Sequence, residues 1–163
     1  MSPEEICRQL GEAKFRSMFL ELTADTMKKV LREAKISTVR LASHTSTRRR
    51  NEEWATKMWH GVAERPLTSC AATVLFEWLT RTRRPMLADF LTTCGVTHEG
   101  GLTDADFMTE VAPDRLIEAG KQLLNQHDRE EVAAYLLFLD ASNKSEHFAP
   151  LHLDAHFSKA TNR

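Results

Sequence analysis

Six short stretches of this sequence carry residues that begin α-helices, and apolar residues spaced three and four apart follow each of them. The stretches are Ser2–Glu5, Asn51–Glu53, Thr68–Ser69, Arg84–Pro85, Pro113–Asp114 and Asp128–Glu131. In such stretches a short polar side chain accepts a hydrogen bond from a free backbone N–H group of the first helical turn. A proline is also favourable there because it has no N–H group that needs a partner, and carboxylates are favourable because they face the positive end of the helix dipole. The sequence therefore predicts an all-α fold of about seven or eight helices.

Length and composition favour one multi-helical domain. The chain has 163 residues, 42% of them hydrophobic and 28% charged, with only 6 Gly and 5 Pro, which disfavours both a disordered chain and a turn-rich β-sandwich. We expect this single domain over residues 1–141 and a polar tail over residues 142–163. Short links between helices predict antiparallel helical hairpins, arranged either as a bundle or as a short superhelix.

Apolar spacing and helix-breaking residues give an approximate position for each helix. Residues 3–34 are expected to form two or three helices with a break near Gly11. Further along, we expect a short helix at 37–42, an exposed connection at 44–50, an amphipathic helix at 52–64, a hairpin at 66–95 ending in a left-handed Gly95, a loop at 96–111, and helices around 116–124 and 130–139. Within the loop, a single helical turn can start at Thr103. Gly120, in the middle of the helix around 116–124, predicts the close approach of a neighbouring helix.

The helical pattern also predicts core residues. The five expected to be buried are Trp59, Trp78, Leu91, Leu124 and Leu136. Four apolar residues of the tail are expected to hold it against the domain: Phe148, Leu151, Leu153 and Phe157.

Two segments resemble small all-helical bacterial proteins of unassigned function. They are residues 76–95, FEWLTRTRRPMLADFLTTCG, followed by VTHEGG, and residues 129–136, REEVAAYL. This resemblance implies a helical fold and supplies no catalytic residue.

Charge is distributed unevenly along the chain, although the net charge is only −1. Residues 35–84 carry ten basic and four acidic side chains, whereas residues 85–163 carry six basic and thirteen acidic ones. Either oppositely charged elements pack together within one fold, or the protein presents two opposite faces to partners.

The acidic N-terminus and the lack of a long apolar run predict a cytoplasmic protein with no membrane segment. Cys7, Cys70 and Cys94 are widely spaced and odd in number, so we expect buried thiols rather than disulfides or a zinc site.

Arginines form the best candidate for a functional surface. Arg48, Arg49 and Arg50 are consecutive, and Arg83 and Arg84 follow later in the chain. Guanidinium groups bind phosphates bidentately, so a patch of them predicts nonspecific binding to nucleic acid or another anion. The alternative is a solvated loop together with an ordinary helix end.

The C-terminal histidines are the best candidate for a metal site. His152 and His156 are four residues apart, which on a helix would bring both imidazoles to one face, and Asp154 or His147 would supply a third ligand. Zinc would be the metal, although a simple packed or exposed tail is the competing interpretation.

Other residues carry weaker signals. Trp54, Trp59 and Trp78 are expected either in the core or around an apolar ligand pocket. His98 with Glu99, and Asp104 with Asp106, lie in the longest loop, where an acid/base pair is conceivable. Gly100 and Gly101 lack the Lys-Ser/Thr that completes a phosphate-binding loop.

Taken together, the sequence favours a protein-interaction or scaffolding domain over an enzyme. Nonspecific nucleic-acid binding through the arginines is the first alternative, and a metal-dependent activity at the histidines is the second. Neither the protein partner nor the oligomeric state follows from these residues.

Overall fold

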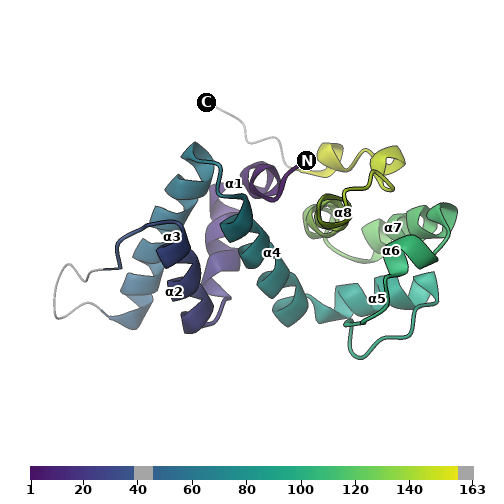
Figure 1. The fold of residues 1–163 in the computed structure, drawn as a ribbon, viewed down its shortest axis with the longest axis horizontal. Coiled ribbons are helices and arrows are strands. Elements are labelled where there is room, and N and C mark those ends of the chain that lie inside the picture. Colours follow the sequence, from purple (N-terminus) through teal and green to yellow (C-terminus); the bar gives the residue numbers. More distant parts are fainter. Residues whose placement is uncertain (39–45, 158–163) are drawn as a thin grey trace. The chain divides into compact units, whose positions relative to one another are not determined.

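The computed structural model describes residues 1–38 and 46–157, and within these ranges it consists of helices joined by loops, with no β-strand, which confirms the all-α prediction (Figure 1). Within them lie eight α-helices, two short 3₁₀-helices and a single isolated bridge between Glu99 and Leu102. The elements are α1 (Pro3–Leu20), α2 (Ala24–Glu33), α3 (Thr47–Glu64), α4 (Thr68–Thr82), α5 (Arg84–Cys94), α6 (Phe107–Glu110), α7 (Pro113–Gln126), α8 (Arg129–Asn143), η1 (Ala149–Leu151) and η2 (Leu153–His156). Among these helices none has both the length and the apolar character needed to cross a bilayer.

The sequence predicted one domain, whereas contacts divide the chain into two compact units. The N-terminal unit is Ser2–Trp78, and the C-terminal unit is Leu79–Arg163 together with Met1.

In the N-terminal unit, side chains close the helix ends. Ser2 and Glu5 form a reciprocal capping box at the start of α1, which satisfies two backbone donors that the helix leaves free. The expected break near Gly11 is present, since Gly11 adopts φ 81° and kinks α1. Arg8 Nε donates to the carbonyl of Val62 at 2.9 Å, so a cation stabilises the negative end of α3.

The core of the N-terminal unit lies between α1, α2, α3 and α4. Trp54 and Trp78 are buried there, as are Phe15, Met18 and Phe19. Trp59 was predicted to be buried but is only half-buried, with its ring 5.6 Å from that of Phe15. Trp59 lies about 100° around the helix from the fully buried Met58, at the edge of the core-facing side of α3.

The segment between α2 and α3 was predicted to contain a short helix and an exposed connection. The expected helix at 37–42 falls mostly on residues 39–45, outside the described residues. The stretch expected to be an exposed connection is in part helical, because α3 begins at Thr47 and contains Arg48, Arg49 and Arg50 in its first turn. The Ser46 hydroxyl caps this turn by accepting from the Arg49 amide, and no apolar residue is needed where the helix end is exposed to water.

Several helices of the C-terminal unit begin or end at residues that the sequence predicted. Pro85 occupies the first turn of α5, and Gly95 ends that helix in the left-handed conformation at φ 75°, as expected of a glycine after a helix. Asp106 precedes the short helix α6, and the Asp128 carboxylate accepts from the Glu131 amide at the start of α8.

Aromatic side chains from several elements meet at Phe90 of α5. Its ring lies 6.2 Å from Phe107, 5.5 Å from Tyr135 and 6.0 Å from Phe148, at separations typical of favourable edge-to-face pairs. The cluster joins α5, α6, α8 and the segment after α8.

Helices α7 and α8 pack closely at Gly120, as predicted. A Cβ at this position would lie 2.7 Å from Leu151 Cδ1 and 3.1 Å from Leu136 Cδ1, so any larger residue would require these leucine side chains to shift. Leu91 and Leu136 are buried as predicted, but Leu124 is half-buried because Leu123 takes the core-facing position beside it.

The segment after α8 packs against α7 and α8 rather than extending into solvent. Phe148, Leu153 and Phe157 are buried and Leu151 is half-buried against Gly120. These are the four residues predicted to hold the tail in place.

Candidate functional site

The strongest candidate surface lies in the N-terminal unit, where cations from two helices are exposed. Arg48, Arg49 and Arg50 occupy the first turn of α3. Positive side chains at this end of a helix oppose its dipole, at a cost of about 0.3–1 kcal/mol each. Local stability therefore does not explain three arginines at this position.

The three arginines differ in their contacts. Arg48 donates from Nε to Glu52 Oε1 at 3.1 Å, yet its side chain is 89% exposed. The Arg50 guanidinium lies 4.7 Å from the centre of the Trp54 ring, a cation–π contact that leaves the planar group oriented. Arg49 is exposed and makes no ion pair with any described residue. Arg49 thus has no ion pair among the described residues, Arg50 is oriented by Trp54, and Arg48 is weakly paired with Glu52.

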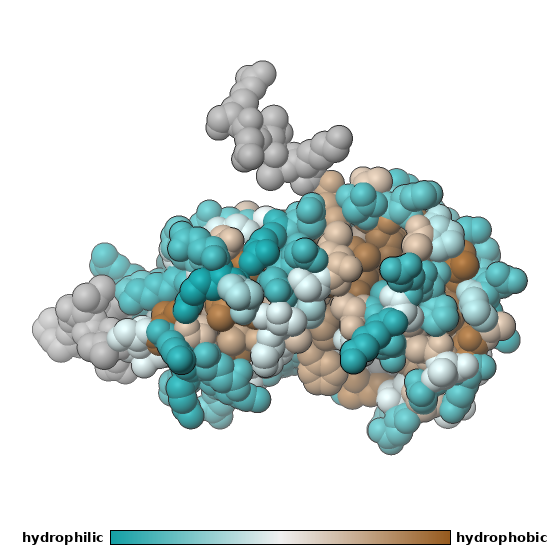
Figure 2. Space-filling view, turned by 45° about the horizontal axis from the view of Figure 1, so that its top comes forward, coloured by the Kyte–Doolittle hydropathy of each residue, from teal (hydrophilic) through white to brown (hydrophobic). Residues whose placement is uncertain are grey.

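Helix α2 adds four further cations: Lys28, Lys29 and Arg32 within the helix, and Lys35 just after it. All four are exposed, and none has an ion-pair partner in the described parts of the chain. Arg32 follows Lys28 by four residues and Lys29 by three, so its side chain neighbours both lysines on the helix surface. Helices α2 and α3 contact one another within this unit, and the face of the unit seen in Figure 2 carries mainly hydrophilic side chains. We call these seven residues the α2–α3 cationic surface.

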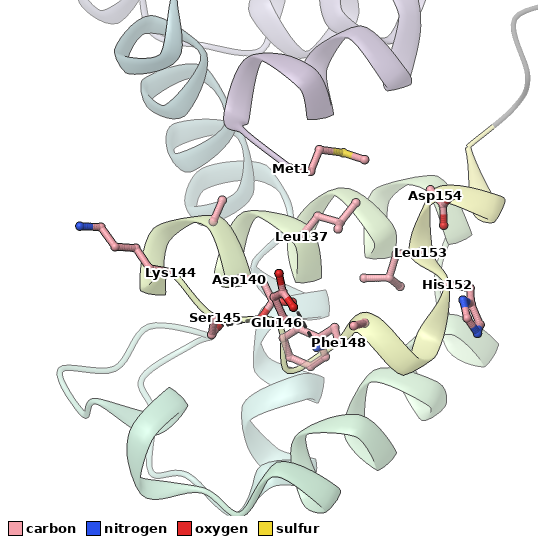
Figure 3. A pocket seen from close by; sticks show the side chains of 12 residues that line it. Met1, Leu137, Asp140, Lys144, Ser145, Glu146, Phe148, His152, Leu153 and Asp154 are labelled. Carbon is pink, nitrogen blue, oxygen red and sulfur yellow. Dashed lines mark hydrogen bonds between the residues drawn. The ribbon is translucent and has the colours of Figure 1, made fainter.

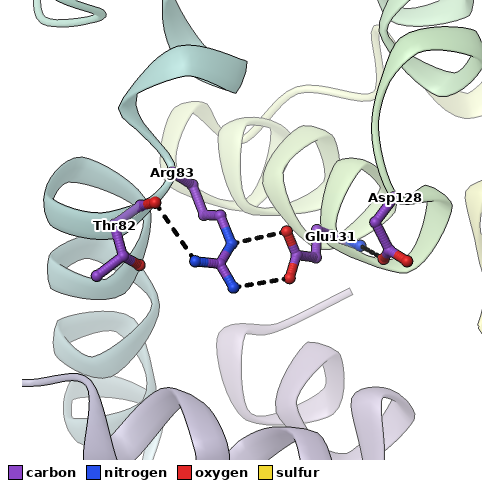
Figure 4. A network of polar contacts seen from close by, with 4 residues as sticks. All are labelled: Thr82, Arg83, Asp128 and Glu131. Atoms are coloured by element: carbon purple, nitrogen blue, oxygen red, sulfur yellow. Dashed lines mark hydrogen bonds and ion pairs between the residues drawn. The ribbon is translucent and has the colours of Figure 1, made fainter.

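Arg83 and Arg84 do not belong to this surface, although the sequence grouped them with Arg48–Arg50. Both lie in the C-terminal unit. Arg83 makes a bidentate ion pair with Glu131, with Nε to Oε2 at 2.7 Å and Nη2 to Oε1 at 2.9 Å (Figure 4). Arg84 donates from Nε to the Thr80 carbonyl at 3.0 Å. Arg83 is therefore a structural link between α5 and α8, and a phosphate would have to displace a carboxylate to reach it.

The C-terminal histidines lie in a segment that does not form the α-helix on which their predicted pairing depends. His152 separates η1 from η2 and adopts a left-handed φ of 47°. Within the described ranges, no group of three His, Cys, Asp or Glu side chains is placed to hold a metal ion. Zinc binding by His152, His156 and Asp154 therefore stays a prediction, without geometric support.

A pocket of about 600 Å³ lies between α8 and the segment that follows it. Figure 3 shows Asp140 and Phe148 near its centre and Lys144 and His152 at opposite edges of the view. Asp140 accepts from Ser145 Oγ at 2.7 Å and from the His147 and Phe148 amides at 3.0 and 3.1 Å. These bonds engage both carboxylate oxygens, so Asp140 holds the segment after α8 against the end of that helix.

The loop candidates are not arranged as an acid/base pair. His98 Nε2 lies 2.8 Å from Thr92 Oγ1, and its Nδ1 accepts from the Gly101 amide at 3.2 Å. Glu99, Asp104 and Asp106 are exposed, and no ion pair joins any of them to His98 in the part of the loop described. Since Nδ1 is an acceptor, a neutral His98 carries its proton on Nε2 and cannot remove a proton from Thr92.

A second histidine pair was not predicted. His127, which ends α7, places Nε2 2.7 Å from Asp89 Oδ2 on α5. The two residues line a shallow pocket of about 330 Å³ with Thr92, Thr93 and Gln126. They are 38 positions apart in the sequence and have no spacing signal, so only the packing of α5 on α7 brings them together.

The cysteines are buried thiols, as expected. Burial raises the pKa of Cys94 to about 11 and raises the pKa of Cys7 further, so both stay protonated and unreactive at neutral pH. Trp54 and Trp78 are core residues, which favours the structural interpretation of the tryptophans.

The chain matches no known protein family, no curated protein and no solved structure.

Proposed function

We propose that this protein is a helical binding module whose N-terminal unit binds the phosphate backbone of nucleic acids through the α2–α3 cationic surface. The observation that carries this proposal is the exposure of six cations on, or directly after, two contacting helices, five of which have no ion-pair partner or aromatic contact among the described residues. Polyphosphate chains are the ligands that such a surface fits best, because each contact releases condensed counterions.

The location of the arginines supports the proposal. An anion bound at the first turn of α3 would offset both the repulsion among Arg48–Arg50 and their unfavourable interaction with the helix dipole. The overall charge agrees, since Ser2–Trp78 has thirteen basic and ten acidic side chains while Leu79–Arg163 has nine and thirteen.

The proposed binding depends on phosphates and not on base sequence. Contacts to phosphate position a protein on nucleic acid but carry little sequence information. A cytoplasmic location, where nucleic acids are accessible, is part of the proposal. A protein-interaction or scaffolding role, which the sequence also predicts, is the alternative to this binding activity.

Binding of a fluorescently labelled DNA duplex, followed by anisotropy, tests the proposal. We expect the logarithm of the association constant to fall linearly with the logarithm of salt concentration, by about 0.9 for each phosphate contacted. Replacing Arg48, Arg49 and Arg50 together with Gln should reduce affinity at least about tenfold and lower the salt slope by about 2–3. Thermal stability should be unchanged or higher, since the substitution removes like charges from a helix start.

A matched control changes three exposed cations of the C-terminal unit, Lys121, Arg129 and Lys144, to Gln. It alters the net charge equally and should leave the affinity within about twofold. Absence of binding to DNA and RNA at low salt would overturn the proposal. An equal loss in both variants would also overturn it, because attraction would then depend on total charge and not on this surface.

A further inference from the structure

His98 joins the loop after α5 to α5 itself, and both of its ring nitrogens are engaged. The Gly101 amide donates to Nδ1 at 3.2 Å, and Nε2 lies 2.8 Å from the Thr92 hydroxyl of α5. An N–H group can only donate, so Nδ1 must be unprotonated and Nε2 must carry the hydrogen when the ring is neutral. The contact therefore specifies one protonation state and one tautomer.

Residues 97–103, the loop that contains His98, are joined to one another by hydrogen bonds. Glu99 and Leu102 exchange backbone hydrogen bonds at 2.8 and 3.1 Å, and Thr103 Oγ1 donates to the Thr97 carbonyl at 2.9 Å. These hydrogen bonds join the two sides of the loop formed by residues 97–103.

Gly101 is the position at which this loop rests on α5. A Cβ there would lie 2.6 Å from the Arg84 carbonyl oxygen and 3.0 Å from the Ala88 nitrogen. Gly101 is buried, so water cannot replace the histidine as acceptor for its amide unless the loop moves. A buried donor without an acceptor is unfavourable.

Protonation of His98 removes that acceptor. The imidazolium has hydrogen on both nitrogens, so Nδ1–H would point at the Gly101 N–H while the Nε2 contact to Thr92 persists. The charged and titratable groups around this site are Glu99 and Asp104 in the loop, Arg84 on α5, and Asp89 with His127 next to Thr92. None of them makes an ion pair with His98 in the described structure, so none compensates for the lost hydrogen bond.

We propose that His98 is a pH-dependent clasp that holds residues 97–103 on α5 when its imidazole is neutral and releases them when it is protonated. Release would take apart the pocket of about 590 Å³ that this loop forms with Arg84, because most of the residues that line the pocket belong to the loop. The clasp lies in the C-terminal unit and does not depend on nucleic-acid binding by the N-terminal unit.

Amide hydrogen exchange of Gly101, measured by NMR and corrected for the intrinsic effect of pH, tests the clasp. Protection should fall about tenfold or more as the pH is lowered from about 7.5 to about 5. In His98→Asn the side-chain oxygen can accept from the Gly101 amide but does not titrate, so protection should not depend on pH. His127→Asn, which removes the other nearby histidine, should behave as the unaltered protein does.

Two results would overturn the proposal. One is a protection of Gly101 that does not change with pH, or that changes equally in His98→Asn. The other comes from the ring nitrogens themselves, whose ¹⁵N shifts report the tautomer in the unaltered protein. Hydrogen on Nδ1 rather than Nε2 near neutral pH would exclude the acceptor role even if the Asn variant failed to fold.

Discussion

Replacing Leu136 with Ala is expected to lower the free energy of unfolding by about 2–5 kcal/mol. Leu136 is fully buried in α8, and its Cδ1 lies over Gly120 of α7. Gly120 has no side chain that could move into the vacated space, so the cavity would persist. Urea denaturation followed by far-UV circular dichroism measures the loss.

Leu137→Ala is the matched control, since it removes the same atoms from the neighbouring, half-buried position of the same helix. We expect it to cost roughly 1 kcal/mol. All three tryptophans lie in the N-terminal unit, so tryptophan fluorescence reports separately on whether that unit is affected. A loss below about half a kilocalorie for Leu136→Ala would place this part of α8 outside the core.

Local chemistry explains why much of the fold could be predicted. Pro85, Gly95 and Asp128 act within one turn of their own positions, and their roles are confirmed. Gly120 also gave a clear signal, because a glycine in the middle of an amphipathic helix is unfavourable unless another helix needs the space.

Apolar spacing was least informative where two large apolar residues are adjacent. Trp59 follows Met58, and Leu124 follows Leu123, and in each pair only one residue is buried. Both members contribute to the apolar stripe, but the direction of the neighbouring helix decides which one faces the core. Spacing also gave no indication of the first turn of α3, because that turn has no apolar residue.

The polar contacts were beyond prediction for a different reason. Arg83 pairs with Glu131 across 48 positions and His127 with Asp89 across 38. Charged residues are common on every helix, so no feature of the sequence distinguishes a pair that meets from one that does not. The predicted arginine group was divided for this reason, with Arg48 and Arg49 exposed, Arg50 half-buried against Trp54, and Arg83 engaged by a carboxylate.

Asp140→Ala is the second substitution for which we expect a large effect. The carboxylate is 9% exposed and accepts three hydrogen bonds from residues 145–148. Alanine would leave the His147 and Phe148 amides without an acceptor, and each such partly or fully buried group costs about 1–3 kcal/mol. We therefore expect a loss of about 2–4 kcal/mol in unfolding free energy.

The same substitution should also increase local unfolding of the segment after α8. Since Asp140 anchors the segment that carries Phe148, Leu153 and Phe157, amide exchange should accelerate across residues 145–157 more than in α5 or α7. Ser145→Ala removes one of the three hydrogen bonds and serves as the control, with an expected cost of about 1 kcal/mol. If Asp140→Ala cost no more than Ser145→Ala and the His147 and Phe148 amides stayed protected, apolar burial alone would hold this segment in place and the carboxylate would be dispensable.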